Sequence, residues 1–155
     1  MRPQSPRILA IFLLLFLLPC LGSCGDDGTS PRSELEPLVG VWQAQSLVMT
    51  HRTNPGISVD LVEEGATFTL SILSNGQYSA SLAAFGQANT ELGTISVSGN
   101  QVTITPTSPG GDPLVATFSF QGSTLILDGD SEFDFNLDGT PEPAFAHIEL
   151  TPLDL

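Results

Sequence analysis

Apolar and polar residues alternate along most of the chain after Leu38. In the segment ATFTLSIL, Phe68, Leu70 and Ile72 fall on one face of an extended chain, with threonine and serine on the other. The segments QVTIT, ATFSF and TLILD repeat this period of two, and threonine and β-branched residues suit a half-buried pleated surface. No long segment follows the helical period. The pattern therefore predicts an all-β fold.

Short turn signals separate these apolar runs. They are Asn75-Gly76, Gly99-Asn100, Gly122-Ser123 and Asp138-Gly139, which favour two-residue loops between antiparallel neighbours. Successive hairpins predict an antiparallel up-and-down β-barrel, with a β-sandwich as the alternative, because a long open sheet leaves its edges exposed. We expect roughly eight to ten strands, near 39–49, 66–73, 77–85, 90–98, 101–106, 114–121, 124–128, 132–137 and 144–152, with 57–62 as the additional one.

The first residues of the chain have a different pattern. Arg2 and Arg7 precede an unbroken apolar run from Ile8 to Leu18. This run has eleven residues and spans about 16 Å as a helix. A helix that crosses a bilayer needs ~20 residues, so the run is too short to do so. A short apolar run behind basic residues is typical of a signal peptide.

The run is followed by the tetrapeptide LGSC, which ends at Cys24 and resembles the lipobox of bacterial lipoproteins. The resemblance implies a signal peptide over 1–23, cleavage after Ser23 and a lipid on Cys24. Residues 24–37 are polar and predict a flexible tether. The lipid would anchor the protein to the cell envelope without a transmembrane helix. By the sorting preference of enterobacterial lipoproteins, which the resemblance brings in, Gly25 after the cysteine implies the outer membrane or the periplasmic face.

The segment LVGVW opens the strand-rich part of the chain. Its Gly40-x-Trp42 resembles the lipocalin and calycin signature, and the resemblance covers roughly 38–152, within a domain that we assign to 38–155. It implies a barrel whose closed end is plugged by Trp42. Lipocalins usually cover this tryptophan with an arginine from near the end of the barrel, but no arginine follows Arg52 here. We therefore expect Trp42 to pack on apolar partners.

The chain is acidic, with a formal net charge of −13. All seventeen aspartate and glutamate residues follow Cys24. This part of the chain has no lysine and only two arginines, Arg32 and Arg52. Such a charge repels nucleic acid and anionic lipid and favours a basic protein partner. A charged coat also keeps an anchored domain soluble.

Few residues suggest catalysis. No Gly-x-Ser-x-Gly elbow or phosphate-binding glycine loop occurs, and His51 and His147 lack neighbours at metal-ligand spacing. We therefore predict a non-enzymatic protein. One hypothesis is a barrel that binds a small apolar ligand, and the other is a filled barrel that acts as an interaction or structural module. The aromatic residues expected in its core are Phe68, Phe85, Phe118, Phe120, Phe133 and Phe135.

The segment DSEFDFNLDGTPEPA, residues 130–144, supplies the one candidate metal site. Its spacing is partly that of a calcium loop, but position 12 is Phe145 instead of glutamate. Because apolar residues alternate through 133–137, we expect a strand with its acids on the outer face, about 13 Å from first to third, ending in a turn at Asp138-Gly139. Calcium held by Asp138, Glu142 and loop carbonyls is the alternative. The candidate ligands are Asp134, Asn136, Asp138 and Glu142.

Overall fold

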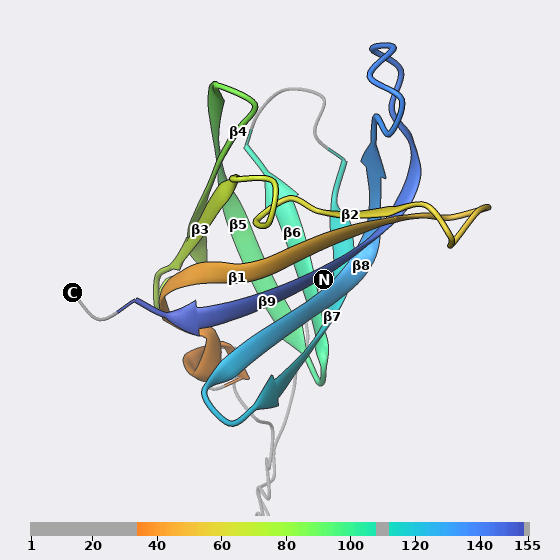
Figure 1. The fold of residues 1–155 in the computed structure, drawn as a ribbon. Coiled ribbons are helices and arrows are strands. Elements are labelled where there is room, and N and C mark those ends of the chain that lie inside the picture. Colours follow the sequence, from red (N-terminus) through yellow and green to blue (C-terminus); the bar gives the residue numbers. More distant parts are fainter. Residues whose placement is uncertain (1–33, 108–111, 154–155) are drawn as a thin grey trace, which may run out of the picture.

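The computed structural model describes residues 34–107 and 112–153 (Figure 1). Within this part a short 3₁₀ turn precedes nine antiparallel strands. The turn is η1 (Glu36–Leu38), and the strands are β1 (Gly40–His51), β2 (Ser58–Asp60), β3 (Thr67–Ile72), β4 (Gln77–Ala84), β5 (Gln87–Ser98), β6 (Gln101–Pro106), β7 (Leu114–Gln121), β8 (Thr124–Phe133) and β9 (Glu142–Pro152).

Eight of these strands close into a barrel. The order is β1-β3-β4-β5-β6-β7-β8-β9, and β9 pairs back with β1. Trp42 marks the closure, because it pairs with Leu70 of β3 on one side and with Pro152 of β9 on the other. The ninth strand, β2, pairs with the second half of β1. The predicted all-β barrel is therefore confirmed, and the β-sandwich alternative is not adopted.

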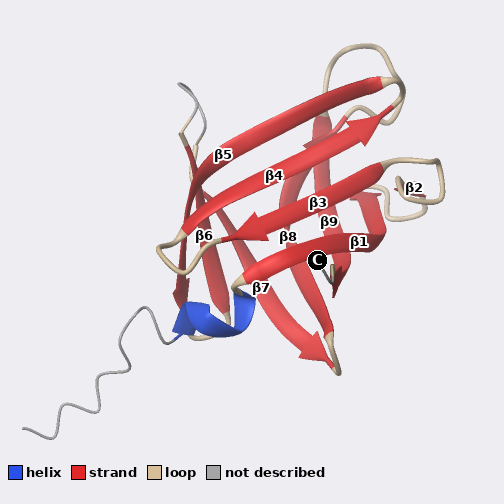
Figure 2. Ribbon diagram, turned by 90° about the vertical axis from the view of Figure 1, so that its left-hand side faces the viewer, coloured by secondary structure: helices blue, strands red, loops and turns tan. Residues whose placement is uncertain are grey.

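Three of the four predicted hairpin turns lie at one end of the barrel, which we call the Trp42 end. Gly76, Gly99 and Gly122 have positive φ angles of 84°, 61° and 64°, which glycine adopts without steric cost. These turns connect β3 to β4, β5 to β6 and β7 to β8. Figure 2 shows η1, in blue, at the same end, below the start of β1.

The prediction for 124–144 is wrong in its strand boundaries. β8 runs without interruption to Phe133, and residues 134–141 form a loop before β9 begins. Side-chain oxygens of the loop accept hydrogen bonds from the loop's own backbone, which competes with strand pairing. Leu137 has a positive φ of 59° and is 77% exposed, so it does not continue the apolar face expected from its alternation with Phe133 and Phe135.

Two other predictions also need correction. Phe85, expected in the core, is 67% exposed at the turn between β4 and β5, with a φ of 53°. Strand β4 ends one residue earlier, so Phe85 has no strand face to occupy. The first strand, predicted near 39–49, continues to His51 at the end of β1.

The core consists of two groups of buried side chains. The first fills the Trp42 end and includes Leu38, Ile72, Val102, Leu125 and Leu150, each at most 2% exposed. The second lies beneath β2 and the segment 61–66 and includes Leu47, Met49, Leu61, Ala66 and Ala144. Phe68 and Phe118, predicted in the core, are partly buried against the first group, and Phe133 and Phe135 against the second. Phe120 is 39% exposed, so the core prediction is only partly met there.

Asp60 attaches the segment after β2 to β1. Its carboxylate accepts hydrogen bonds from Ser46 Oγ at 2.7 Å, from the Leu47 amide at 3.1 Å and from the Val62 amide at 2.9 Å. Burial raises the pKa of Asp60, but these bonds outweigh burial, so the pKa lies below its ordinary value of 3.8. The ionised carboxylate therefore stabilises the folded state.

We expect Asp60→Ala to lower the free energy of unfolding by about 2 kcal/mol at pH 7, because three hydrogen bonds to a charged acceptor are lost. The segment 61–66, which packs over the second core group, also loses its attachment to β1. Since the folded-state pKa is depressed, this stability is complete above the unfolded pKa and is lost as pH falls through the folded one. Urea unfolding at pH 7 and pH 3 measures it. Glu64→Ala, at an exposed position in the same segment, is the control, and an equal effect of both variants would contradict the assignment.

Candidate functional site

On β4 and β6, and on β9 as far as Ile148, the inner face becomes more exposed with distance from the Trp42 end, whereas Met49 and Ala144 stay buried in the second core group. On β6, Val102 is fully buried and Ile104, the next inward residue, is partly exposed. On β9 the same change occurs from Leu150 to Ile148, and on β4 it occurs from Tyr78 to Ala80. Alternation and register place all these side chains toward the interior. Solvent therefore reaches the part of the interior beside β4, β6 and the middle of β9, toward the end opposite Trp42, which we call the open end.

The partly exposed inner face is mainly apolar. Side chains from four strands contribute to it, and all of them pack on one or both of the core groups. Small alanine side chains alternate with larger ones, which leaves part of the inner surface uncovered. The residues are Ala80, Leu82, Ile104, Ala116, Phe118, Ala146 and Ile148.

A polar pair interrupts this apolar lining. Glu91 of β5 pairs with Ala80 of β4 and therefore faces the interior. The Tyr78 hydroxyl donates a hydrogen bond of 2.5 Å to Glu91 Oε1. Burial, and next the bond and the negative charge of Glu91, raise the pKa of Tyr78 well above its ordinary value. Tyr78 thus stays a protonated donor at neutral pH.

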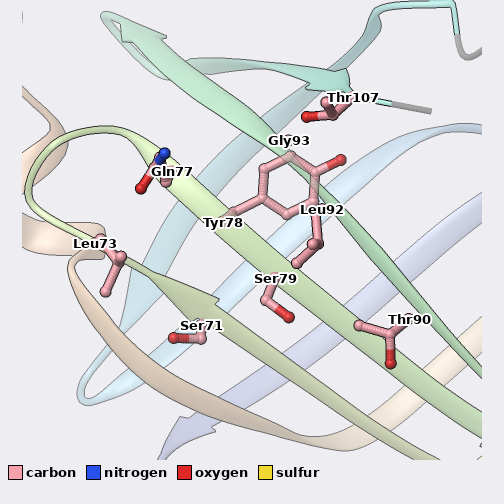
Figure 3. Close-up of a pocket in the computed structure, with 9 residues that line it drawn as sticks. All are labelled: Ser71, Leu73, Gln77, Tyr78, Ser79, Thr90, Leu92, Gly93 and Thr107. Atoms are coloured by element: carbon pink, nitrogen blue, oxygen red, sulfur yellow. The ribbon is translucent and has the colours of Figure 1, made fainter. Parts of the chain in front are cut away.

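Gly93 makes room for this pair. It lies directly opposite Tyr78 in the β4–β5 register. A Cβ atom on Gly93 would stand 2.7 Å from Tyr78 Cε1 and 2.2 Å from the backbone oxygen of Thr105. The missing side chain lets the Tyr78 ring lie against β5 and reach Glu91. Figure 3 shows the Tyr78 ring beside Gly93 and Leu92.

A surface pocket of about 570 Å³ lies around the same tyrosine, over strands β3 to β5 (Figure 3). Exposed Leu73 and Leu92, at 51% and 57%, give it apolar patches among serine and threonine side chains. Tyr78 is the one titratable residue among those that line it, and the other polar contacts come from serine, threonine and glutamine side chains. The lining residues are Ser71, Leu73, Gln77, Tyr78, Ser79, Thr90, Leu92, Gly93 and Thr107.

The predicted signature residues lie together at the Trp42 end. Gly40 has a φ of 149°, and Trp42 is 6% exposed. The Trp42 indole Nε1 donates a hydrogen bond of 2.9 Å to the Leu38 backbone oxygen, and its ring lies 6.2 Å from that of Phe120. Trp42 thus connects η1, β1 and β7. Cys24, the predicted lipid attachment site, lies outside the described residues.

The acidic segment 134–142 is curled, in contrast to the extended strand predicted from sequence. Asp134 accepts from the amides of Asp138 and Gly139 at 3.1 and 2.7 Å, and Asn136 Oδ1 accepts from the Asp138 amide at 2.9 Å. Glu142 accepts from the Phe135 amide at 2.9 Å and from the Asn136 side chain at 2.8 Å. The geometric objection to calcium, which assumed an extended chain, is therefore wrong.

These contacts also give the acidic side chains a structural role, because they fix the loop through its own amides. In residues 34–107 and 112–153, no group of three or more histidine, cysteine, aspartate or glutamate side chains is arranged to hold a metal ion. Calcium binding by this loop stays the alternative hypothesis, which a calorimetric titration of wild type and Asp138→Ala tests.

The two histidines are far from equivalent. His51 Nδ1 accepts a hydrogen bond of 3.2 Å from the Thr53 amide, and its ring lies 5.3 Å from that of Phe135. His147 lies on the outer face of β9, where Nδ1 is 2.7 Å from Asp128 Oδ1 and Nε2 is 3.4 Å from Glu149 Oε1. The bond to Asp128, opposed by partial burial and helped by Glu149, raises the pKa of His147.

A raised folded-state pKa means that the charged imidazolium stabilises the folded protein fully below the unfolded pKa of about 6.5, and that this contribution is lost as pH rises through the folded pKa. We expect a small effect, below about 1 kcal/mol, because these side chains are 33–46% exposed. Urea unfolding at pH 6 and pH 8.5 measures it. His147→Gln should reduce the difference between the two pH values, and an unchanged difference would contradict the ion pair.

Comparison with known protein families and with curated proteins finds no match to this chain. Within the part of the chain that the structure describes, no helix is long and apolar enough to cross a membrane. The likeness to lipocalins therefore rests on the closed eight-stranded antiparallel barrel and on the position of Trp42.

Sequence reasoning missed the Tyr78–Glu91 pair. The alternation along β5 does indicate that Glu91 faces inward, since it lies two residues from Gly93 and four from the buried Ile95. The partner on β4, however, depends on the register between strands, and a sequence pattern does not specify it. The Asp128–His147 contact was missed for the same reason, because these residues are paired across β8 and β9.

Proposed function

We propose that this protein is a lipid-anchored envelope protein whose barrel binds a small apolar molecule without catalysing a reaction. The observation that supports ligand binding is the apolar inner face that becomes accessible toward the open end. A barrel of eight strands is wide enough to hold one small ligand, and apolar surface reached by solvent gains free energy when a ligand covers it. The LGSC tetrapeptide and the apolar run before it support the anchor.

An alternative proposal is a filled acidic barrel that serves as an interaction or structural module for a basic partner. The net charge of −13 and the absence of lysine support it. The two proposals differ in one property, because a filled barrel has no saturable interior site for an apolar molecule.

The test is saturable binding of an apolar fluorophore, such as N-phenyl-1-naphthylamine, by the purified full-length protein. Ala80→Phe adds a large side chain to the interior, and Ser81→Phe adds the same side chain to the adjacent outward position. We expect saturable binding that Ala80→Phe weakens at least tenfold and that Ser81→Phe leaves unchanged, with circular dichroism as the check on folding. Equal binding by both variants, or no saturable binding by the wild type, would refute an interior ligand site.

A further inference from the structure

Glu91 is unusual among the charged residues of the described strands, because it faces the interior at mid-strand. Other carboxylates of the barrel wall, such as Asp128 and Glu149, lie on the outer face. Glu142 is also at an inward register position, but it lies at the start of β9 and bonds to the loop 134–141. A partly buried carboxylate beside apolar side chains such as Ala80 is costly unless a donor or a cation pairs with it.

Only part of the hydrogen-bonding capacity of Glu91 is used. Tyr78 donates to Oε1, and the described residues provide no further hydrogen bond to this carboxylate. Since no buried side-chain oxygen or nitrogen in this part of the chain lacks a partner, Oε2 is in contact with solvent. Its acceptor sites are therefore free to meet a ligand that enters from the open end.

The surroundings of Glu91 determine which ligand can replace this solvent. Ala80, directly opposite, places only a methyl group beside the carboxylate. A wholly apolar ligand that covered Glu91 would remove water from a charge and return no hydrogen bond. A carboxylic acid would add like-charge repulsion in a protein that is already strongly acidic. A protonated amine supplies both the donors and the opposite charge.

We propose that the barrel binds an apolar molecule that carries a protonated amino group, with this group bound to Glu91 and the apolar part along the inner face formed by Ala80, Ile104, Phe118 and Ile148. This inference rests on the proposed function, since it assumes that the interior holds an apolar ligand. Tyr78 acts as a positioning residue, because its hydroxyl holds Oε1 and directs Oε2 toward the ligand.

The experiment compares decylamine, decanol and decanoic acid as competitors of the bound fluorophore at pH 7, below their aggregation concentrations. We expect decylamine to bind the full-length wild type at least tenfold more tightly than decanol, with decanoic acid weakest. Glu91→Gln keeps the shape of the side chain and should bring the amine-to-alcohol ratio close to one without weakening decanol. Glu63→Gln removes an equal charge at an exposed position of the segment 61–66 and should leave the ratio unchanged.

The possible failures are distinct. Equal binding of decylamine and decanol by the wild type, or an unchanged ratio in Glu91→Gln, would overturn the role of Glu91 while the apolar ligand site stands. An equal fall of the ratio in Glu63→Gln would assign the preference to the overall charge and would also overturn it. If neither competitor displaces the fluorophore and the fluorophore does not bind saturably, both the inference and the proposed function fail.

Discussion

Gly93→Ala is expected to lower the free energy of unfolding by at least about 3 kcal/mol, because the added Cβ has no space on either side. It would lie 2.2 Å from the Thr105 backbone oxygen, 2.9 Å from Pro106 Cα and 2.7 Å from the Tyr78 ring. Two of these neighbours are backbone atoms of β6, so relief requires that β5 and β6 separate. Urea unfolding followed by far-ultraviolet circular dichroism gives the value.

Gly56→Ala is the matched control for this substitution. Gly56 also has no positive φ, and a Cβ there meets only the Asn54 side chain, at 3.5 Å, which is an ordinary contact. We expect a change below about 1 kcal/mol for the control. A Gly93→Ala protein as stable as Gly56→Ala would show that β5 and β6 do not approach so closely at this point.

Trp42→Ala is expected to cost about 3–5 kcal/mol, the range for removing a buried aromatic side chain. The substitution leaves a cavity in the first core group, removes the contact with Phe120 and leaves the Leu38 oxygen without its donor. Because Trp42 pairs with both β3 and β9, the loss falls at the point where the barrel closes. Thermal and urea unfolding measure the change.

Trp42→Phe separates packing from the hydrogen bond. Phenylalanine keeps much of the apolar volume but leaves the Leu38 oxygen unpaired, so we expect about 1–3 kcal/mol. Trp42→Ala should therefore have a clearly lower free energy of unfolding than Trp42→Phe. A Trp42→Ala protein within about 1 kcal/mol of the wild type would mean that neighbouring side chains fill the space, and that Trp42 is not essential to the closure.

Most of the barrel was predictable because each strand has one apolar face and three of the turns contain glycine at positions of positive φ. Phe68, Leu70 and Ile72 alternate with polar residues, and this alternation fixes which face of β3 is buried. That the sheet closes into a barrel was predictable, since successive hairpins leave two exposed edge strands that can pair with each other. The pairing of β9 with β1, by contrast, is a contact between residues about one hundred positions apart, and local patterns do not specify its register.

The error at 134–137 has a clear physical origin. Phe133, Phe135 and Leu137 have the spacing of a strand, but Asp134, Asn136 and Asp138 between them can accept bonds from nearby amides. Period-two alternation considers only the burial of side chains and ignores this competition for backbone donors. Phe133 and Phe135 still contact each other, with ring centroids 5.0 Å apart, and both pack against the second core group. Apolar residues at this spacing can therefore be buried without a continuous strand.

The position of η1 has a consequence for how the barrel would be oriented on a membrane. The described chain begins beside the Trp42 end, only ten residues after Cys24. If Cys24 carries the proposed lipid, this stretch reaches at most about 35 Å, so the Trp42 end stays near the bilayer. The longest strands extend about 40 Å in the other direction. If the barrel stands upright on this tether, the open end faces away from the anchoring membrane, and ligand exchange takes place with the surrounding aqueous phase.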